Sequence, residues 1–390
     1  MNAITCAPWP NFSEKEGELV KEVLLSNKIN YWTGPEGRLF EKEFSAMADC
    51  QHSIALANGT LAIDLALIAL GIGPGDDVVV TPRSFMASAS AVQNSGARPV
   101  FADVDLDSQN ITAESIEAVL TDKTRAIVCV HLAGWPCDMA AIMELAEQKR
   151  IAVIEDCAQA HGAKFNGKSV GSYGDISAWS FCQDKIMTTG GEGGMVTTNN
   201  SDLFELMWAY KDHGKSRQKM EAPAKNRSFK YVHDTFGSNF RLTEMQSAIG
   251  SYQLEQLEHW TNERTRHAMH YHDELSKLDV VRAPQPPSNI QHAYYKYYFF
   301  LNLDQLIGGW DRDRVVEAIN DEGGQCFSGS CPELYREQAF VSAYGEHPRL
   351  KNAARLGKES LMLTCHPGLS VEYLEFNLGI IKQVLRSIVK

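Results

Sequence analysis

The chain has 390 residues, which is enough for two domains or for one large and one small lobe. Hydrophobic residues make up 44% and charged residues 22%, as in a soluble globular protein, and the formal net charge of -12 argues against nucleic acid or an anionic membrane as the main partner. Nine scattered cysteines without a CxxC pair indicate free thiols in a reducing, cytoplasmic compartment, and the sequence shows neither a signal peptide nor a membrane span.

The chain begins with two segments of helical spacing, 13–26 and 37–49. A short strand follows, and an apolar helix begins directly after it at Asn58, Gly59 and Thr60. A helix N-terminus presents free backbone N–H groups, and a glycine lets a phosphate approach closely, so this turn is a candidate phosphate site. The alternative is a simple helix cap by Asn58 or Thr60.

From there the pattern alternates between short apolar strands and helices. The predicted helices cover 86–96, 113–120 and 139–149, and the predicted strands cover 77–80, 99–103, 125–131, 152–155, 176–181 and 194–197. This alternation predicts βαβ units, and therefore an α/β fold with a mostly parallel sheet covered by helices on both faces. Ligands of such sheets bind at the carboxyl ends of the strands, so the polar residues after each strand are the candidates for a site.

One lysine, Lys185, stands between the apolar run 176–181 and a glycine-rich loop. Burial at the end of a strand would destabilise its charged form, and the amine could then act as a nucleophile near neutral pH. Taken alone, this segment fits a surface lysine in a hairpin turn equally well.

Residues at other strand ends favour the nucleophile. Asp156 follows the run 151–154, where a carboxylate can pair with a protonated pyridine nitrogen, and Phe85 supplies a flat side chain. Pyridoxal phosphate needs a lysine for its Schiff base, an acid for its ring nitrogen, a flat side chain against its ring and an anion hole for its phosphate. With the turn at 58–60, the sequence offers all four around Lys185.

Five segments together resemble the DegT/StrS-type sugar aminotransferases, which depend on pyridoxal 5'-phosphate and belong to the fold-type-I, aspartate-aminotransferase-like superfamily. The resemblance runs nearly the whole length and is densest in ANGTLAIDLAL, VVVTPRSFMASASAV, IEDCAQAHGA, SFCQDKIMTTGGEGG and FGSNFRLTEMQSAIG. It implies a large cofactor-binding domain at 1–255, whose first dozen residues could pack on the small lobe, and a smaller C-terminal α/β domain at 256–390.

The resemblance also implies how the cofactor ring is held. Lys185 would form the Schiff base and act as the catalytic residue, and Asp156 would pair with the pyridine nitrogen. Gln159 would lie by the ring hydroxyl, and Phe85 would stack on the ring.

The same resemblance implies a phosphate site shared between two subunits. The turn of Asn58, Gly59 and Thr60, with the Ser180 hydroxyl, would hold the phosphate. Asn239 would be lent across the dimer interface to the neighbour's phosphate, so a homodimer with shared active sites is part of the prediction.

The implied reaction moves an amino group from an amino acid, by resemblance L-glutamate, to a keto-sugar. We expect a nucleotide-linked 4-keto-6-deoxyhexose and a pathway of surface glycan such as lipopolysaccharide O-antigen. A dehydrating branch of the family has histidine in place of the Schiff-base lysine, so Lys185 favours amino transfer. Dehydration, transamination of a 3-keto sugar, a cyclitol or another non-nucleotide ketone, and a regulatory protein that retains the fold remain alternatives.

Other residues are candidates for substrate binding only. Arg83, Lys211 and Arg241 are cations that could hold an anionic nucleotide. The polar or aromatic residues of the C-terminal part that could reach a sugar are His292, Tyr297, Tyr335 and His366.

No metal site is predicted. Cys326 and Cys331 have a metal-like spacing but no second pair nearby. His267, His270 and His272 share a predicted helix without a carboxylate or cysteine to complete a ligand set, so we expect them on a solvated face.

Overall fold

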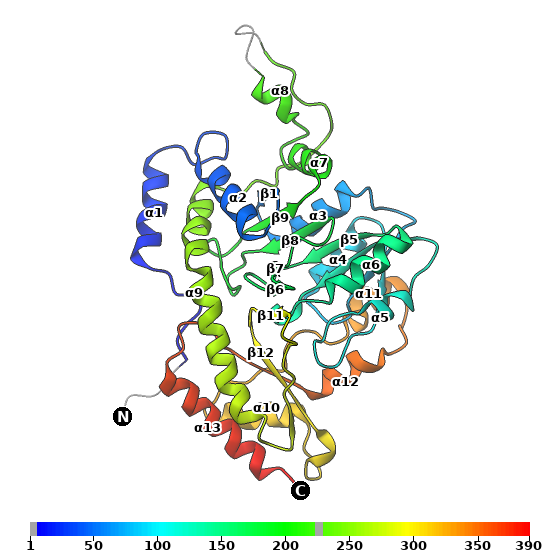
Figure 1. The fold of residues 1–390 in the computed structure, drawn as a ribbon, viewed down its shortest axis with the longest axis vertical. Helices are drawn as coiled ribbons and strands as arrows, with labels where there is room; N and C mark the ends of the chain where they lie inside the picture. The colour runs from blue at the N-terminus through cyan, green and yellow to red at the C-terminus, as the bar shows by residue number, and fades with distance from the viewer. Residues whose placement is uncertain (1–5, 223–228) are drawn as a thin grey trace.

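The structure is a computed structural model that describes residues 6–222 and 229–390. Its centre is a seven-stranded sheet with the strand order β1-β9-β8-β5-β4-β2-β3 (Figure 1). The strands are β1 (His52–Leu56), β2 (Asp77–Val80), β3 (Arg98–Phe101), β4 (Thr124–Val130), β5 (Ala152–Asp156), β8 (Ile176–Ser180) and β9 (Gly194–Thr198). β9 runs antiparallel to β1 and to β8, and the other neighbouring pairs are parallel, which confirms the mostly parallel sheet.

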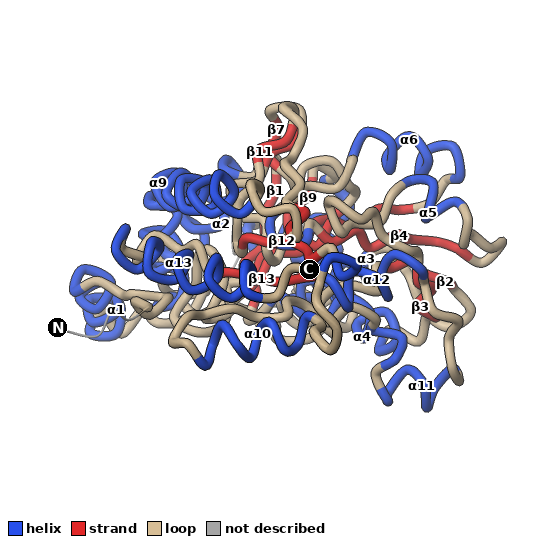
Figure 2. Tube along the Cα trace, turned by 90° about the horizontal axis from the view of Figure 1, so that it is seen from below, coloured by secondary structure: helices blue, strands red, loops and turns tan. Residues whose placement is uncertain are grey.

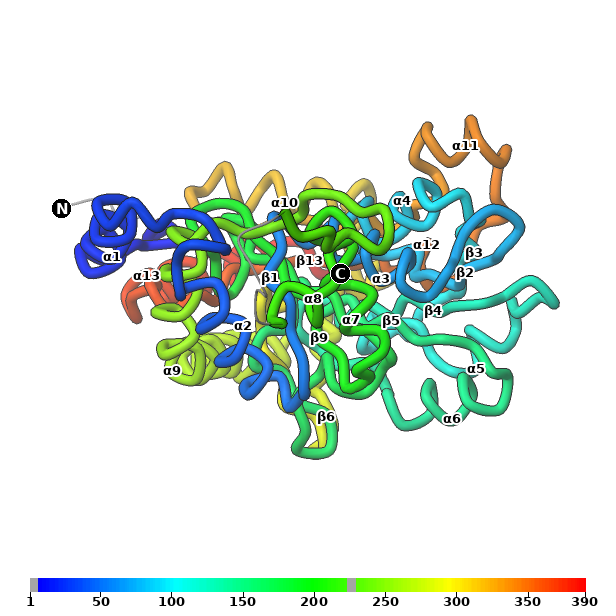
Figure 3. Tube along the Cα trace, turned by 90° about the horizontal axis from the view of Figure 1, so that it is seen from above, coloured from blue at the N-terminus to red at the C-terminus, as the bar shows by residue number. Residues whose placement is uncertain are grey.

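Helices cover both faces of this sheet, as the buried apolar strands require. The helices before the long helix α9 are α1 (Glu14–Leu25), α2 (Glu36–Met47), α3 (Gly59–Ala69), α4 (Ala87–Asn94), α5 (Ala113–Glu117), α6 (Met139–Lys149), α7 (Ser201–Lys211) and α8 (Arg217–Glu221). α3, α4 and α7 share one hydrophobic core with one face of the sheet, and α5 and α6 share another with the opposite face. Figures 2 and 3 show α4 and α6 on opposite sides of the strands.

The sequence signals explain where these helices begin. Asn58 caps α3, since its side-chain oxygen accepts a hydrogen bond from the Leu61 N–H at 2.9 Å. α9 (Glu244–Leu275) begins with a capping box between Thr243 and Gln246. It packs tightly on α2 because residue 250 is glycine, where a Cβ would lie 2.6 Å from the Phe40 ring.

A second, smaller sheet follows α9, in the order β10-β12-β13. Its strands are β10 (Val281–Arg282), β12 (Tyr297–Leu301) and β13 (Ser360–Leu363), and the helices around it are α10 (Arg312–Asp321), α11 (Gln338–Tyr344), α12 (Lys351–Glu359) and α13 (Val371–Ser387). A third small sheet consists of β11 (Ile290–Gln291), β6 (Lys164–Phe165) and β7 (Lys168–Ser169), and the short 3-10 helices are Leu132–Gly134, Leu303–Gln305 and Leu334–Arg336. The predicted division after residue 255 falls inside α9 and stays a prediction.

One prediction about α9 is wrong. His267 is fully buried rather than solvated, and its Nδ1 lies 3.1 Å from the carbonyl oxygen of His366. The helix packs on the C-terminal part of the chain here, so this side chain faces protein. Within 6–222 and 229–390, no helix combines the length and the apolar character needed to cross a membrane.

Candidate active site

The carboxyl ends of four parallel strands, β2, β4, β5 and β8, border one cavity of about 1030 Å³. Eight of the nine predicted site residues line it: Asn58, Gly59, Thr60, Phe85, Asp156, Gln159, Ser180 and Lys185. Loops that are far apart in the sequence meet here because parallel strands end at the same edge of a sheet.

Lys185 lies in the loop between β8 and β9, whose ends pair through Ser180 and Gly194. Two hydrogen bonds hold the lysine backbone: the Lys185 N–H donates to the Cys182 carbonyl of the same loop at 3.1 Å, and Nε1 of Trp9, from the N-terminal segment, donates to the Lys185 carbonyl at 2.8 Å. The side chain lines the cavity, with its Nζ 5.2 Å from the centroid of the Tyr295 ring. The lysine is therefore in a hairpin loop, but its amine faces the cavity.

Asp156 ends β5 and is almost fully buried, with 5% of its surface exposed. Its Oδ2 accepts a hydrogen bond from Ser88 Oγ at 2.7 Å, and its Oδ1 accepts one from the Ala158 N–H at 3.1 Å. Ser88 in turn lies 2.9 Å from Ser84 Oγ. A carboxylate can accept about four hydrogen bonds, so this one has capacity left toward the cavity.

The Gln159 side chain is oriented by the backbone. Its Oε1 accepts a hydrogen bond from the Ala133 N–H at 2.7 Å, and Ala133 has a left-handed backbone with φ of 57°. Because the oxygen is engaged, the amide N–H₂ is the group left to donate to a ligand.

The start of α3 and the end of β8 form a tight cradle. A Cβ on Gly59 would lie 2.6 Å from the Ser180 Cβ, so only glycine permits this approach. The Asn58 side chain acts as the helix cap, as one of the two interpretations predicted, while the first backbone N–H groups of the helix have no intrahelical partner. Ser180 and these N–H groups suit a phosphate, and together with Lys185 and Asp156 they fit a pyridoxal phosphate cofactor.

The Phe85 side chain is 70% exposed and lies on the cavity wall. Most of this apolar ring is therefore uncovered by protein and available to a planar ligand.

Asn239 is the predicted site residue that does not line the cavity. It is exposed, and its backbone bridges to Asp212 at the base of the segment that carries α8. Its predicted role in a neighbouring subunit stays a prediction.

The three cations expected to hold a nucleotide are used elsewhere. Arg83 is fully buried and donates to Gln109 and Ser360, at 2.8 and 2.9 Å. Lys211 is also fully buried, against the ring of Tyr31. Arg241 pairs with Asp212 at 2.6 Å. None of the three lines the cavity.

The four C-terminal candidates for sugar contact do not line the cavity either. His292, Tyr297, Tyr335 and His366 are all buried, and none of them lines the cavity. Their polar atoms or rings contact the protein instead: Tyr335, for example, donates to Glu333, and the His366 ring stacks on Trp9. The position of a residue in the C-terminal part of the sequence did not show whether it lines the cavity or lies in the protein interior.

Sequence reasoning missed several cavity residues. Those that carry a charge are Asp184, Glu192, Lys296 and Glu337, and those that close the cavity from the C-terminal part of the chain include Tyr295, Phe327, Cys331, Met362 and Thr364. Tyr295 and Lys296 belong to an aromatic run that leads into β12, and this run was the feature of the sequence that could have indicated them as cavity residues. Ser88 was also missed, although it follows Ser84 by one helical turn.

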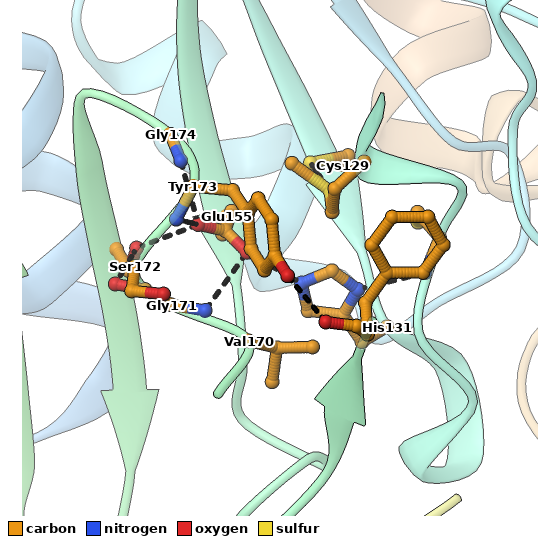
Figure 4. A network of polar contacts seen from close by, with 12 residues as sticks. Cys129, His131, Glu155, Val170, Gly171, Ser172, Tyr173 and Gly174 are labelled. Atoms are coloured by element: carbon orange, nitrogen blue, oxygen red, sulfur yellow. Dashed lines mark hydrogen bonds and ion pairs between the residues drawn. The ribbon is translucent and has the colours of Figure 1, made fainter. Parts of the chain in front are cut away.

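A buried polar cluster lies on the opposite side of β5. The possible ligand atoms of His131, Glu155 and Cys157 lie within 4.8 Å of one another, which suggests a metal. However, the His131 imidazole and the Glu155 carboxylate already have hydrogen-bond partners within the protein. His131 Nδ1 accepts from the Cys137 N–H at 3.0 Å, so its Nε2 carries the proton that it donates to Glu155 at 3.0 Å (Figure 4). We therefore assign this cluster to structure rather than to metal binding.

The chain is similar to known aminotransferases. A family model described as the DegT/DnrJ/EryC1/StrS aminotransferase family matches residues 10–376. GDP-perosamine synthase of Escherichia coli O157:H7 is 38% identical, over 93% of this chain and 93% of its own length. UDP-N-acetyl-3-dehydro-alpha-D-glucosamine 3-aminotransferase of Acidithiobacillus ferrooxidans is 39% identical, over 93% of this chain and 92% of its own.

Among solved structures, an aminotransferase from Psychrobacter cryohalolentis matches with a TM-score of 0.96 and 51% identity. The match covers 98% of this chain and 99% of that one. The chain belongs to the DegT/DnrJ/EryC1/StrS aminotransferase family, and it is a pyridoxal-phosphate-dependent aminotransferase of fold type I.

Proposed function

We propose that this enzyme transfers an amino group from L-glutamate to a nucleotide-linked keto-sugar, a 4-keto-6-deoxyhexose, in the cytoplasm. The product would be an amino sugar for surface glycan, such as lipopolysaccharide O-antigen. The observation that carries the proposal is the single cavity of about 1030 Å³, which joins Lys185, Asp156 and the Gly59 cradle to walls from the C-terminal part of the chain. Its volume exceeds what one cofactor fills, so a second, larger ligand can enter.

Two relatives support a nucleotide-linked substrate. Their names carry GDP in one case and UDP in the other. The UDP relative is named as a 3-aminotransferase acting on a 3-dehydro sugar, so amination of a 3-keto sugar is the second candidate.

Lys185 has two tasks in the proposed reaction. It would hold the cofactor covalently until an amino donor displaces it. Its freed Nζ would then take the proton from the donor's α-carbon as general base and give it back as general acid. With the keto-sugar in the donor's place, the same nitrogen would move the proton in the opposite direction.

The other cavity residues would hold the cofactor. The cofactor, when bound, supplies an electron sink for the charge that develops at the α-carbon. Asp156 would keep the ring nitrogen protonated, and the Gln159 amide would donate to the ring hydroxyl. Phe85 would cover one face of the ring, and Ser180 with the N-terminus of α3 would hold the phosphate.

We further propose that the enzyme works as a homodimer. Three aromatic side chains near α8, Phe229, Tyr231 and Phe236, are 78%, 85% and 100% exposed, and Asn239 is exposed beside them. Figure 1 shows that α8 projects away from the sheet. Exposed aromatic side chains on a projecting segment are typical of a surface that a partner covers, and a second copy of this chain would bring Asn239 to its neighbour's phosphate.

The test is to reduce the holoenzyme with borohydride and to map the labelled peptide. We expect the cofactor on Lys185 and no label in the Lys185→Arg variant. A label on another lysine would refute the assignment. Incubation with L-glutamate should release 2-oxoglutarate, and a screen of 4-keto and 3-keto nucleotide sugars would then decide between the two candidate substrates.

A further inference from the structure

A second lysine shares the cavity with Lys185. Lys296 lies directly before β12, is partly buried and lines the cavity wall. Its Nζ lies 5.0 Å from the centroid of the Tyr295 ring, and the Nζ of Lys185 lies 5.2 Å from the same centroid. Both side chains line the same cavity, and their distances to one ring centroid place the two Nζ atoms within about 10 Å of each other.

Lys296 is a cation without a bonded partner. Within the described ranges, no carboxylate lies at ion-pair distance from its Nζ, and no residue accepts a hydrogen bond from it. The charge of Asp184 acts on it from farther away, but the Asp184 carboxylate accepts a hydrogen bond from the Tyr295 hydroxyl. Among the described residues that line the cavity, the cations are Lys185 and Lys296. Once Lys185 is bound to the cofactor, Lys296 is the remaining side-chain cation of this wall.

Two other cations act on Lys296. Arg264 is fully buried, over the ring of Trp9, and its Nε and Nη2 have no hydrogen-bond partner in the described part of the chain. Burial is the main cause that lowers the pKa of Lys296; Cys365 and Asp184 oppose this, whereas the charges of Arg264 and Lys185 add to it. An incoming anion would therefore gain from a desolvated, unpaired ammonium group and relieve the repulsion among these cations.

We infer that Lys296 binds a carboxylate of the amino donor. The inference deepens the proposed function and rests on it. In the donor, a carboxylate is attached to the reacting α-carbon, so it must lie close to Lys185 during the reaction. In a nucleotide sugar, the sugar ring separates the reacting carbon from the diphosphate. The proximity of Lys296 to Lys185 therefore favours the donor carboxylate over the sugar's phosphate.

The test uses holoenzyme and two probes that cannot react: glutarate for the donor's carboxylates and UDP for the phosphates. Calorimetry gives the Kd of each probe for wild type, Lys296→Met and Lys296→Arg. We expect Lys296→Met to bind glutarate about 10- to 100-fold more weakly, because a charge-assisted hydrogen bond is lost, and to bind UDP as wild type does. Lys296→Arg should keep most of the glutarate affinity.

The matched control is Lys358→Met, since Lys358 is exposed on α12 outside the cavity. It should bind both probes as wild type does. The inference is overturned if Lys296→Met binds glutarate within about twofold of wild type, or if the variant loses affinity for UDP and not for glutarate. If Lys296→Met does not fold, Lys296→Gln is measured in its place. Borohydride mapping on the same wild-type sample separates this failure from failure of the proposed function, which would appear as a missing label on Lys185.

Discussion

Two consecutive carboxylates on β5, Glu155 and Asp156, have opposite surroundings. Side chains of neighbouring residues in a strand point to opposite sides of the sheet. Glu155 therefore faces away from the cavity, and Asp156, the last residue of the strand, lies next to the cavity. Glu155 accepts from the N–H groups of Gly171, Tyr173 and Gly174, at 2.8, 2.8 and 2.7 Å. It also accepts from the Ser177 hydroxyl and from His131, and Figure 4 shows the backbone N–H groups directed at it.

Asp156 has two protein donors, against five for Glu155. The exposed fractions of the two side chains, 5% for Asp156 and 0% for Glu155, are too similar to distinguish their roles. The number of protein donors does distinguish them: a carboxylate whose lone pairs are all used within the protein stabilises the fold, and one with lone pairs left over can bind a ligand. Four predictions test or refine this comparison.

The largest effect is expected for Glu155→Gln. The glutamine amide would direct an N–H₂ donor toward backbone N–H donors, which cannot accept it. The substitution would also remove the negative charge that accepts the hydrogen bond from His131. We expect a loss of about 3–5 kcal/mol in the free energy of unfolding, measured by denaturant titration. The kcat of the folded enzyme should stay within a few fold of wild type. A loss of stability below about 1 kcal/mol would contradict a structural role for Glu155.

Asp156→Asn should give the opposite result. The amide can keep the bonds to Ser88 and Ala158, but it cannot hold a proton on the cofactor's ring nitrogen by its charge. We expect kcat to fall about 10²- to 10³-fold, equal to about 3–4 kcal/mol, while the free energy of unfolding stays within about 1 kcal/mol of wild type. If Asp156→Asn lost as much free energy of unfolding as Glu155→Gln, the distinction between a structural carboxylate and a ligand-binding one would be wrong.

Ser88→Ala tests how far the Asp156 side depends on its protein partners. The change removes the 2.7 Å hydrogen bond to Asp156 Oδ2. We expect a loss of about 1 kcal/mol in stability and a decrease of a few fold in kcat, because the carboxylate loses one of its two fixed contacts. Ser90→Ala on the same helix is the control, since Ser90 is only partly buried. Equal effects of the two changes would show that the Ser88 contact does not position Asp156.

The mildest perturbation is acid. Burial by itself would raise the pKa of Glu155, but the hydrogen bonds from His131, Gly174 and Gly171 outweigh it and lower the pKa. A carboxylate with a lowered pKa in the folded state contributes stability above the unfolded value of about 4.3, and this contribution is lost as the pH falls through the folded pKa. The Tm of wild type should therefore fall below about pH 4.3 more steeply than that of Glu155→Gln, and parallel curves would contradict this.

The sequence alone was sufficient for the strands of the central sheet and for the residues at their ends, but not for the strands of the two smaller sheets. Apolar runs bounded by polar turns predicted β2, β5 and β8 almost to the residue, and α6 was predicted with its observed bounds. The helix expected over 253–278 is observed as α9, Glu244–Leu275, so its start was predicted too late. The glycine at 250 weakens the helical pattern there, and it is explained by the close approach of the Phe40 ring of α2.

What the sequence by itself determined is the set of groups at one edge of the sheet: Lys185, Asp156, Gln159, Ser180 and the turn at Gly59. The physical reason is local, since parallel strands must end at the same edge whatever the rest of the chain does.

Tertiary structure alone decided which charges reach the cavity. Arg83 follows β2 and Lys211 ends α7, yet both are buried in the interior. Lys296, directly before β12, lines the cavity instead. Whether a cation is buried, paired or free depends on how distant segments pack, and spacing along the chain does not carry that information.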